Sequence, residues 1–291
     1  MKKILPALLA LLIFESASLA ISETLLFKLL ELKRESYLSR RGELNLDIIP
    51  SYSQDTALVP WSITKSSVSS VGMNLRVGVS NRLEASLKIP YLVINRKVFV
   101  SSWESFRGSG IGDPSISTQF ELLSERFNRP AVYLGLGATL PLTRSSFDNL
   151  SPREIAVGNG YALYDAGISF LKSSDPAVIY GGIDYQLSQK RGNYDPADVL
   201  NYNTGIGFAL NQSVSVSIGI SGAVVGEERQ VVGGIETPVT SSYNHTALSL
   251  GVTLVFWKDL IFNPNVMIGL TEDETDFAFS FGVTKRIKEA Q

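Results

Sequence analysis

Few residues of this chain could support covalent or metal chemistry. Among its 291 residues there is one histidine, His245, and no cysteine. The lack of cysteine excludes a disulfide scaffold, a thiolate metal site and a cysteine nucleophile. A single histidine cannot supply the histidine ligands of the usual zinc sites. The sequence therefore predicts no metal site and no cofactor.

A serine activated by His245 is the remaining route to catalysis. Such a pair requires a serine within hydrogen-bond reach of an oriented histidine. In phospholipase-type barrels the serine follows the histidine by two residues on the lipid-facing side, and here Ala247 occupies that position. The side chain of His245 shares its strand face with Ala247, Ser249 and Gly251, the face expected to line the interior. We therefore predict that the protein is not an enzyme, with a barrel hydrolase as the weakest alternative.

A pair of glycines, Gly205 and Gly207, begins like a dinucleotide-binding fingerprint. The third glycine position holds Leu210, and no helix is predicted to follow it. A similar pair at residues 158–160 fails in the same way. These glycines are better explained as relief of crowding inside a curved sheet.

The elements that must position these residues are strands, and the clearest is the segment from Tyr202 to Val225. Large apolar side chains alternate there with Gly, Ser, Asn and Ala in two arms, which are joined by residues 211–213. A period of two predicts extended strands, and the three-residue connection predicts a hairpin. Each arm has about the 9–11 residues that a tilted strand needs to cross a bilayer. We interpret the large side chains as facing lipid and the small ones as lining a lumen.

Alternation of this kind recurs along the chain and predicts an all-β, twelve-stranded, antiparallel, up-and-down transmembrane β-barrel. Short connections alternate with long ones, which lie near 55–65, 95–111, 142–157, 189–200 and 226–241. Bacterial barrels have short periplasmic turns and longer external loops, so an even strand count places both chain ends on the periplasmic side. The predicted strands are approximately 44–54, 66–79, 82–94, 112–123, 130–141, 158–172, 176–188, 201–210, 213–225, 242–256, 259–271 and 275–287.

A secreted β-sandwich or jelly roll would also show many alternating strands. Such a domain carries charge on its outer face, whereas the second face of most strands here holds Gly, Ser, Asn or Thr. Overall 44% of the residues are hydrophobic and 19% are charged, which favours the membrane barrel. The formal net charge of −2 provides no basic patch for nucleic acid.

The N-terminal residues 1–20 have the pattern of a secretory signal peptide. Two lysines precede an apolar run, and small residues precede a cut after Ala20. Residues 21–42 are predicted to contain a short amphipathic helix, at about 23–38, which meets a periplasmic partner or enters the barrel as a plug; a poorly ordered leader is the alternative. Residues 43–288 form the predicted outer-membrane barrel. This organisation predicts a protein of the Gram-negative outer membrane.

Charged residues on the small-residue faces should point into the lumen, because an Arg or Lys facing lipid at mid-bilayer costs roughly 2–4 kcal/mol. Arg76 and Glu84 flank the first tight turn and should lie diagonally opposite each other. Such charges either form a mixed-charge constriction that filters solutes or make internal salt bridges that hold a largely closed barrel together. The candidate pore-lining residues are Asp47, Arg76, Glu84, Lys88, Glu121, Asp165 and Asp184.

The expected partners are membrane lipid, lipopolysaccharide and a small solute. Acidic stretches at 193–195 and 272–274 either bind Ca²⁺ between lipopolysaccharide headgroups or are solvated loops. Aromatic residues near strand ends fit the girdles of membrane barrels. They are Trp61, Tyr161, Tyr164, Tyr180, Tyr185, Tyr202, Tyr243 and Trp257.

Several stretches resemble one known family. They include GSGIGDPSISTQFELL from residue 108, RPAVYLGLGATLPL from residue 129, AVGNGYALYDAGISFLKS from residue 156 and TEDETDFAFSFGVTKRI from residue 271. Over roughly residues 44–287 the chain is similar to the outer-membrane barrel family labelled "putative meta-pathway of phenol degradation" transporters. One departure is the non-aromatic chain end. The resemblance implies a twelve-stranded barrel that passes small, often hydrophobic, molecules.

The family motif comprises Gly110, Gly112, Asp113 and Pro114. We expect it to form a turn that delivers the chain into a strand, with Asp113 at a pore mouth as the alternative. The predicted function is a channel for passive diffusion of small, hydrophobic or aromatic, molecules. The runner-up is a closed barrel with a structural or adhesive role, whose N-terminal helix engages a periplasmic partner.

Overall fold

The computed structural model describes residues 38–288, except positions 60–61, 100, 149, 152, 233–234, 258–259 and 272–274. The expected signal peptide at 1–20 and most of the expected helical segment at 21–42 lie outside the described residues, as does the acidic stretch at 272–274. The described part of the chain contains strands and no helix, so it offers no helical segment that could cross a membrane.

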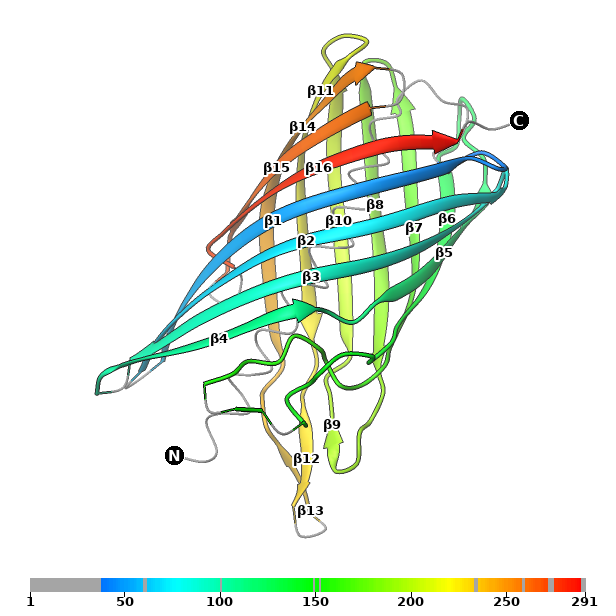
Figure 1. Ribbon diagram of the computed structural model, residues 1–291. Coiled ribbons are helices and arrows are strands. Elements are labelled where there is room, and N and C mark those ends of the chain that lie inside the picture. Colours follow the sequence, from blue (N-terminus) through cyan, green and yellow to red (C-terminus); the bar gives the residue numbers. More distant parts are fainter. Residues whose placement is uncertain are drawn as a thin grey trace.

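The molecule is built around one antiparallel sheet that closes on itself (Figure 1). Neighbouring strands follow one another in chain order, and the pairing of the first strand with the last completes the ring. The strands of this wall are β1 (Leu44–Val59), β2 (Ser62–Ser80), β3 (Leu83–Phe99), β4 (Trp103–Ile111), β5 (Ser115–Leu123), β6 (Ala131–Thr139), β7 (Leu163–Ser174), β8 (Ala177–Ser188), β10 (Val199–Ala209), β11 (Val214–Val225), β14 (Tyr243–Trp257), β15 (Leu260–Gly269) and β16 (Phe277–Lys288).

These thirteen strands occupy twelve positions in the wall, because β4 and β5 are successive parts of one position. β5 pairs with β3 between Leu83 and Lys88, and β4 pairs with β3 between Tyr91 and Phe99. The break between them falls at Gly112–Pro114, where proline has no N–H to donate to a ladder. The predicted twelve-stranded antiparallel barrel is confirmed, and each predicted segment coincides with a wall strand.

Some stretches expected to be long loops are strands, so that part of the prediction is wrong. β1, β2 and β3 continue well past their expected ends, and β4 lies within the expected loop at 95–111. A second, small sheet of β9 (Tyr194–Asp195), β12 (Arg229–Val232) and β13 (Ile235–Pro238) extends past the lower rim in Figure 1. In these extensions the outward row includes Lys65 and Lys97 beside Ile63 and Phe99, so the backbone pairing continues where the regular apolar alternation has ended.

Successive residues of the wall strands face out and in alternately. On β11, Ile218 and Ile220 are 44% and 43% exposed on the outer surface, whereas Ser215 and Ser217 on the inner face are buried. The outer surface carries many other exposed apolar side chains, among them Ile116, Leu136, Ile168, Ile183, Leu250 and Phe279. A continuous apolar belt of this kind fits hydrocarbon and not water, which separates the barrel from a secreted sandwich.

Reversing the polarity of one outward position should test this orientation. Ile218→Arg is expected to lower the free energy of unfolding by about 2–4 kcal/mol, because it places a charge in hydrocarbon. Ser217→Arg, one residue away on the inner face, should be tolerated better since its guanidinium enters a wet lumen. Urea titration in lipid vesicles measures both values. Equal losses for the two variants would contradict the assignment of faces.

Candidate functional site in the barrel lumen

The charged residues singled out in the sequence lie on the inner face of the wall. Their neighbours in the chain on either side point outward, as Leu46 and Ile48 do around Asp47. The structure brings Asp47, Arg76 and Glu84 together and places Asp165 and Asp184 diagonally across β7 and β8; the part of all seven in permeation stays a prediction. The residues are Asp47 on β1, Arg76 on β2, Glu84 and Lys88 on β3, Glu121 on β5, Asp165 on β7 and Asp184 on β8.

Asp47 is the centre of a hydrogen-bonded network near the short turns. Its carboxylate is 2% exposed and accepts hydrogen bonds from Arg76 Nε at 2.7 Å and Arg76 Nη2 at 3.1 Å. Asn74 Nδ2 and Thr284 Oγ1 donate to the same carboxylate at 3.1 and 2.9 Å. Because a bidentate ion pair with further donors satisfies both buried charges, the network ties β1 to β2 and to β16 where the barrel closes.

Glu84 extends this network to the chain that precedes β1. Arg76 Nη1 lies 3.7 Å from Glu84 Oε2, so the diagonal pair expected across the first tight turn is formed. The same carboxylate oxygen accepts hydrogen bonds from Ser39 N at 2.8 Å and from Ser39 Oγ at 2.6 Å. Glu84 therefore holds the segment before β1 by hydrogen bonds and also pairs with Arg76.

Residues 40–43 pack directly on the inner wall of β2. Gly42 N donates to Gly78 O at 2.8 Å, and Gly78 N donates to Glu43 O at 3.0 Å. A Cβ atom at Gly78 would collide with the carbonyl oxygen of Arg40, so this close approach requires glycine. Glu43 is 1% exposed and pairs with Arg286 Nε at 3.0 Å. The segment before β1 is thus held to β2 and β16 by buried contacts.

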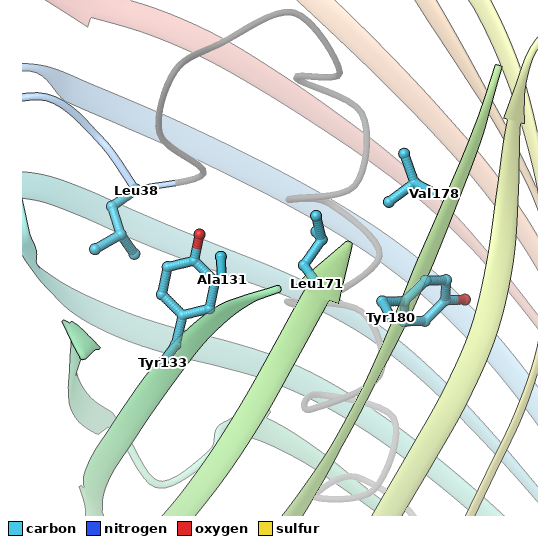
Figure 2. Packing of buried hydrophobic residues seen from close by; sticks show 6 residues of the cluster. All are labelled: Leu38, Ala131, Tyr133, Leu171, Val178 and Tyr180. Atoms are coloured by element: carbon cyan, nitrogen blue, oxygen red, sulfur yellow. The ribbon is translucent and has the colours of Figure 1, made fainter. Parts of the chain in front are cut away.

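Leu38 carries the chain across the lumen to the opposite wall, as Figure 2 shows. Its side chain is fully buried and packs in a cluster whose other members belong to β6, β7 and β8: Ala131, Tyr133, Leu171, Val178 and Tyr180. Ser39, the next residue, is bonded to β3. The lumen is therefore crossed near its short-turn end. The plug hypothesis itself rests on residues 23–37, which lie outside the described residues.

Glu121, Asp165 and Asp184 form no ion pair with any of the described residues. Asp184 Oδ1 accepts only a long hydrogen bond of 3.4 Å from Asn201 Nδ2. Its other oxygen lies over Gly167, where a Cβ atom would come within 2.8 Å of it. Carboxylates without a cationic partner inside a wet lumen produce a negative potential that attracts cations.

Asp113 holds the connection between β6 and β7 against the wall at the long-loop end of the barrel, the end opposite the short turns. Its Oδ1 accepts hydrogen bonds from Thr143 N at 3.0 Å and Thr143 Oγ1 at 2.7 Å, and its Oδ2 accepts one from Asn159 N at 2.6 Å. Both donors belong to the connection between β6 and β7, so the expectation of a simple turn misses the role of this carboxylate. Asp113 lies at the barrel mouth but is only 8% exposed.

The same connection lines the inside of β4. Arg107 N donates to Arg153 O, and Ile155 N donates to Arg107 O, both at 3.0 Å. Ile155 is buried in a cluster with Leu92 and Ile94 of β3, and a Cβ atom at Gly108 would collide with the Ile155 carbonyl oxygen. The loop therefore adds a second layer inside the wall and narrows this end of the lumen.

An aromatic cluster closes around Glu228 in the outer connections. The ring centroids of Tyr194 and Phe147 are 5.5 Å apart, and those of Tyr194 and Tyr161 are 6.2 Å apart. Glu228 is 2% exposed, and its carboxylate lies near the Tyr194 hydroxyl. Burial raises the pKa of Glu228, and burial with the nearby Glu228 raises the pKa of Tyr161 and of Tyr194. The sequence reasoning missed this cluster because its members come from separate connections.

The predicted aromatic girdle is only partly present. Tyr164 and Tyr185 lie on the outer surface, at 46% and 47% exposed. Tyr161 and Tyr180, each 4% exposed, instead point inward, so the girdle prediction is wrong for them. The side chains of Trp61 and Trp257 lie outside the described part of the structure.

His245 faces the lumen, as the alternation predicts, and its ring centroid is 6.2 Å from that of Tyr243. The residue two positions on, Ala247, also points inward and is buried. Among the described residues, His, Asp and Glu side chains form no group of three or more that could hold a metal ion.

Residues 48–287 match the family described as "Putative MetA-pathway of phenol degradation". The chain belongs to this family. The match confirms the resemblance carried by the sequence motifs and includes Gly110, Gly112, Asp113 and Pro114. In this phenol-degradation family member the motif joins β4 to β5 and supplies the carboxylate that holds the inner loop.

Solved structures similar to this family member are outer-membrane barrels. The COG4313 outer membrane channel from Pseudomonas putida F1 has a TM-score of 0.63 and 12% identity, over 85% of this chain and 96% of that chain. The translocator domain of autotransporter NalP from Neisseria meningitidis has a TM-score of 0.56 and 11% identity, over 94% of this chain and 97% of that chain. At such identities the similarity shows the fold, which is that of an outer-membrane β-barrel.

Neutralising the two carboxylates on β7 and β8 should weaken any preference of the lumen for cations. Asp165→Asn and Asp184→Asn preserve side-chain size and remove the negative charge. In a KCl gradient, the reversal potential of the double variant should move toward zero, with the cation-to-anion permeability ratio reduced about twofold or more. Asp195→Asn is the control, since Asp195 lies on β9, outside the barrel wall, and pairs with Lys190 at 2.6 Å. An unchanged reversal potential in the double variant would rule out a filtering role.

The buried Glu228 predicts that the outer aromatic cluster is more stable in acid. Because burial raises its pKa, the packed arrangement favours the protonated acid. That stabilisation is complete below the ordinary glutamate pKa of about 4.3 and is lost as the pH rises through the raised value. Hydrogen exchange of the loops around residues 191–195 and 226–232, corrected for intrinsic rates, should show less protection at about pH 8 than at about pH 5. Glu228→Gln should abolish the difference; a difference that persists in this variant would assign it to another group.

Proposed function

We propose that the protein is a passive channel of the Gram-negative outer membrane for small molecules, including apolar and aromatic ones. The observation that carries the proposal is the inner wall of β10, β11 and β14. Over the middle of these strands, at residues 201–207, 215–221 and 249–253, its inward side chains are small or polar, while most outward ones are large and apolar. Toward the long-loop end the inner face instead carries the hydrophobic cluster of Val199, Ala223 and Val225. Small residues leave space inside a barrel, and hydroxyl and amide groups keep that space wet.

The family description supports the aromatic part of this proposal, and the likeness to an outer membrane channel of Pseudomonas putida supports the channel part. The signal-peptide pattern at 1–20 supplies the export route that an outer-membrane location requires. Lipid and lipopolysaccharide are the proposed partners of the apolar belt, with Tyr164 and Tyr185 exposed on its surface.

A closed barrel with a structural or adhesive role is the second candidate. It is favoured by the segment Leu38–Glu43, which crosses the short-turn end, and by the loop held by Asp113 at the other end. The two candidates differ in whether a solute passes between these two narrow ends.

Permeation by the folded barrel tests the choice, and Asp113 provides the sharpest variant. Proteoliposomes should swell in iso-osmotic arabinose faster than protein-free vesicles, and Asp113→Ala should swell faster still. The substitution removes three hydrogen bonds to a carboxylate, each worth about 1.5–3 kcal/mol, and so releases the inner loop from the wall.

Asp148→Ala is the matched control, because Asp148 belongs to the same connection but bonds only to Ser145 within it. It should swell at the wild-type rate. If neither the wild type nor Asp113→Ala swells or conducts in planar bilayers, the closed-barrel candidate replaces the channel.

A further inference from the structure

A niche in the lumen wall between β8 and β15 offers hydrogen-bond acceptors that have no protein donor among the described residues. Its inward-facing lining consists of Tyr180, Asn203, Ser221, Ser249 and Asn265. These five side chains come from five successive wall strands, and none of them is charged. The strands β8, β10, β11 and β14 are separated from β1 by at least two other strands, whereas β15 lies next to β16.

Two glycines make room for the niche. Along one row of the ladder Tyr180 pairs with Gly205, Gly205 with Gly219, and Gly219 with Ser249. The Tyr180 hydroxyl lies over both glycines, and a Cβ atom at Gly219 would be 2.8 Å from it. The tyrosine ring therefore lies along the wall instead of across the lumen, and one side of the niche is an aromatic surface.

The acceptors are the amide oxygens of Asn203 and Asn265. Both oxygens are buried, and no described residue donates a hydrogen bond to either of them. Asn265 is 4% exposed, so its amide is fixed by its surroundings and is not a solvated surface group. A buried acceptor left without a donor is unfavourable, and a lumen water or a solute hydroxyl can meet the requirement.

We propose that this niche is a binding site for a small neutral molecule that carries two or more hydroxyl donors. Acceptors on two separate strands, β10 and β15, call for two donors on the ligand, and the hydroxyls of Ser221 and Ser249 between them can donate to the ligand in return. The Tyr180 ring selects a ligand with an apolar side. An ionic ligand would lose its hydration without gaining a counter-charge here. The niche defines the class of solute that the proposed channel would carry, and in that respect the inference rests on the proposed function.

The chain supplies its own matched controls. Asn201 and Asn263 lie on β10 and β15, each two residues from a niche asparagine and on the same inner face, but neither lines the niche. Asn203→Leu and Asn265→Leu remove an acceptor at nearly constant size, while Asn201→Leu and Asn263→Leu make the same change outside the niche. Asn265→Asp keeps an acceptor oxygen at the critical position.

Binding is measured on the detergent-folded barrel by NMR saturation transfer, which does not require permeation. Erythritol serves as the aliphatic probe and resorcinol as the aromatic one, with glycine betaine as a probe without hydroxyl donors. We expect saturable binding of at least one hydroxylated probe and none of betaine. Asn203→Leu and Asn265→Leu should each weaken binding about fivefold, which is the loss of one hydrogen bond, whereas the two control variants and Asn265→Asp should bind as the wild type does.

Each outcome bears on one claim. If no probe binds saturably, the niche proposal is wrong. It is also wrong if the niche variants and the control variants weaken binding equally, provided that all of them are folded, as shown by heat-dependent mobility on gels. Binding of resorcinol alone or of erythritol alone supports it and assigns the natural ligand to the aromatic or the aliphatic diols. Binding without conductance in planar bilayers leaves the niche standing and overturns the channel.

Discussion

Hydrogen bonding of the backbone in hydrocarbon is the constraint from which the rest of this structure follows. A strand edge in a bilayer has no water to bond with, so a sheet that spans the membrane has to close. Here the pairing of β1 with β16, from Leu44–Lys288 to Gln54–Phe277, removes both edges. Once the sheet is a ring, each strand has one face toward lipid and one toward the interior, and every polar side chain with a role inside the membrane has to use the second face.

The inner face is divided between two kinds of wall. Around β1, β2, β3 and β16 the inner face is charged. Those charges pair with one another and bind the segment before β1, through Asp47, Arg76 and Glu84. Over the middle of β10, β11 and β14 the inner face is small and neutral, with glycine and serine opposite one another across the ladder. Buried ion pairs are rigid and fill space, whereas small hydroxyl side chains leave space for water. A solute path therefore belongs beside the neutral wall.

The local alternation of side chains was sufficient to predict the strands of the barrel wall, but not the segments and side chains that fill the lumen. The alternation at Ile218 and Ser217 is set by the period of a strand, so the strand count, the faces and the Arg76–Glu84 pair could be derived from the sequence. The carboxylate of Asp113 resembles part of a turn because its donors, Thr143 and Asn159, are 30 and 46 residues away. Tyr180 was misplaced in a girdle for a related reason: the space it enters exists only because Gly205 and Gly219 meet it on two other strands.

The carboxylates of the lumen thus fall into two groups with different physical consequences. Glu43, Asp47, Glu84 and Asp113 accept several short hydrogen bonds each and hold a segment of chain against the wall. The first three also have an arginine partner, which compensates their charge and leaves little field along the axis of the pore. Asp165 and Asp184 have no cationic partner among the described residues, and Asp184 accepts only the long hydrogen bond from Asn201, so their charge remains available to passing ions. Partner geometry, and not the number of charges, therefore decides which acidic residues act on a solute and which act on the protein itself.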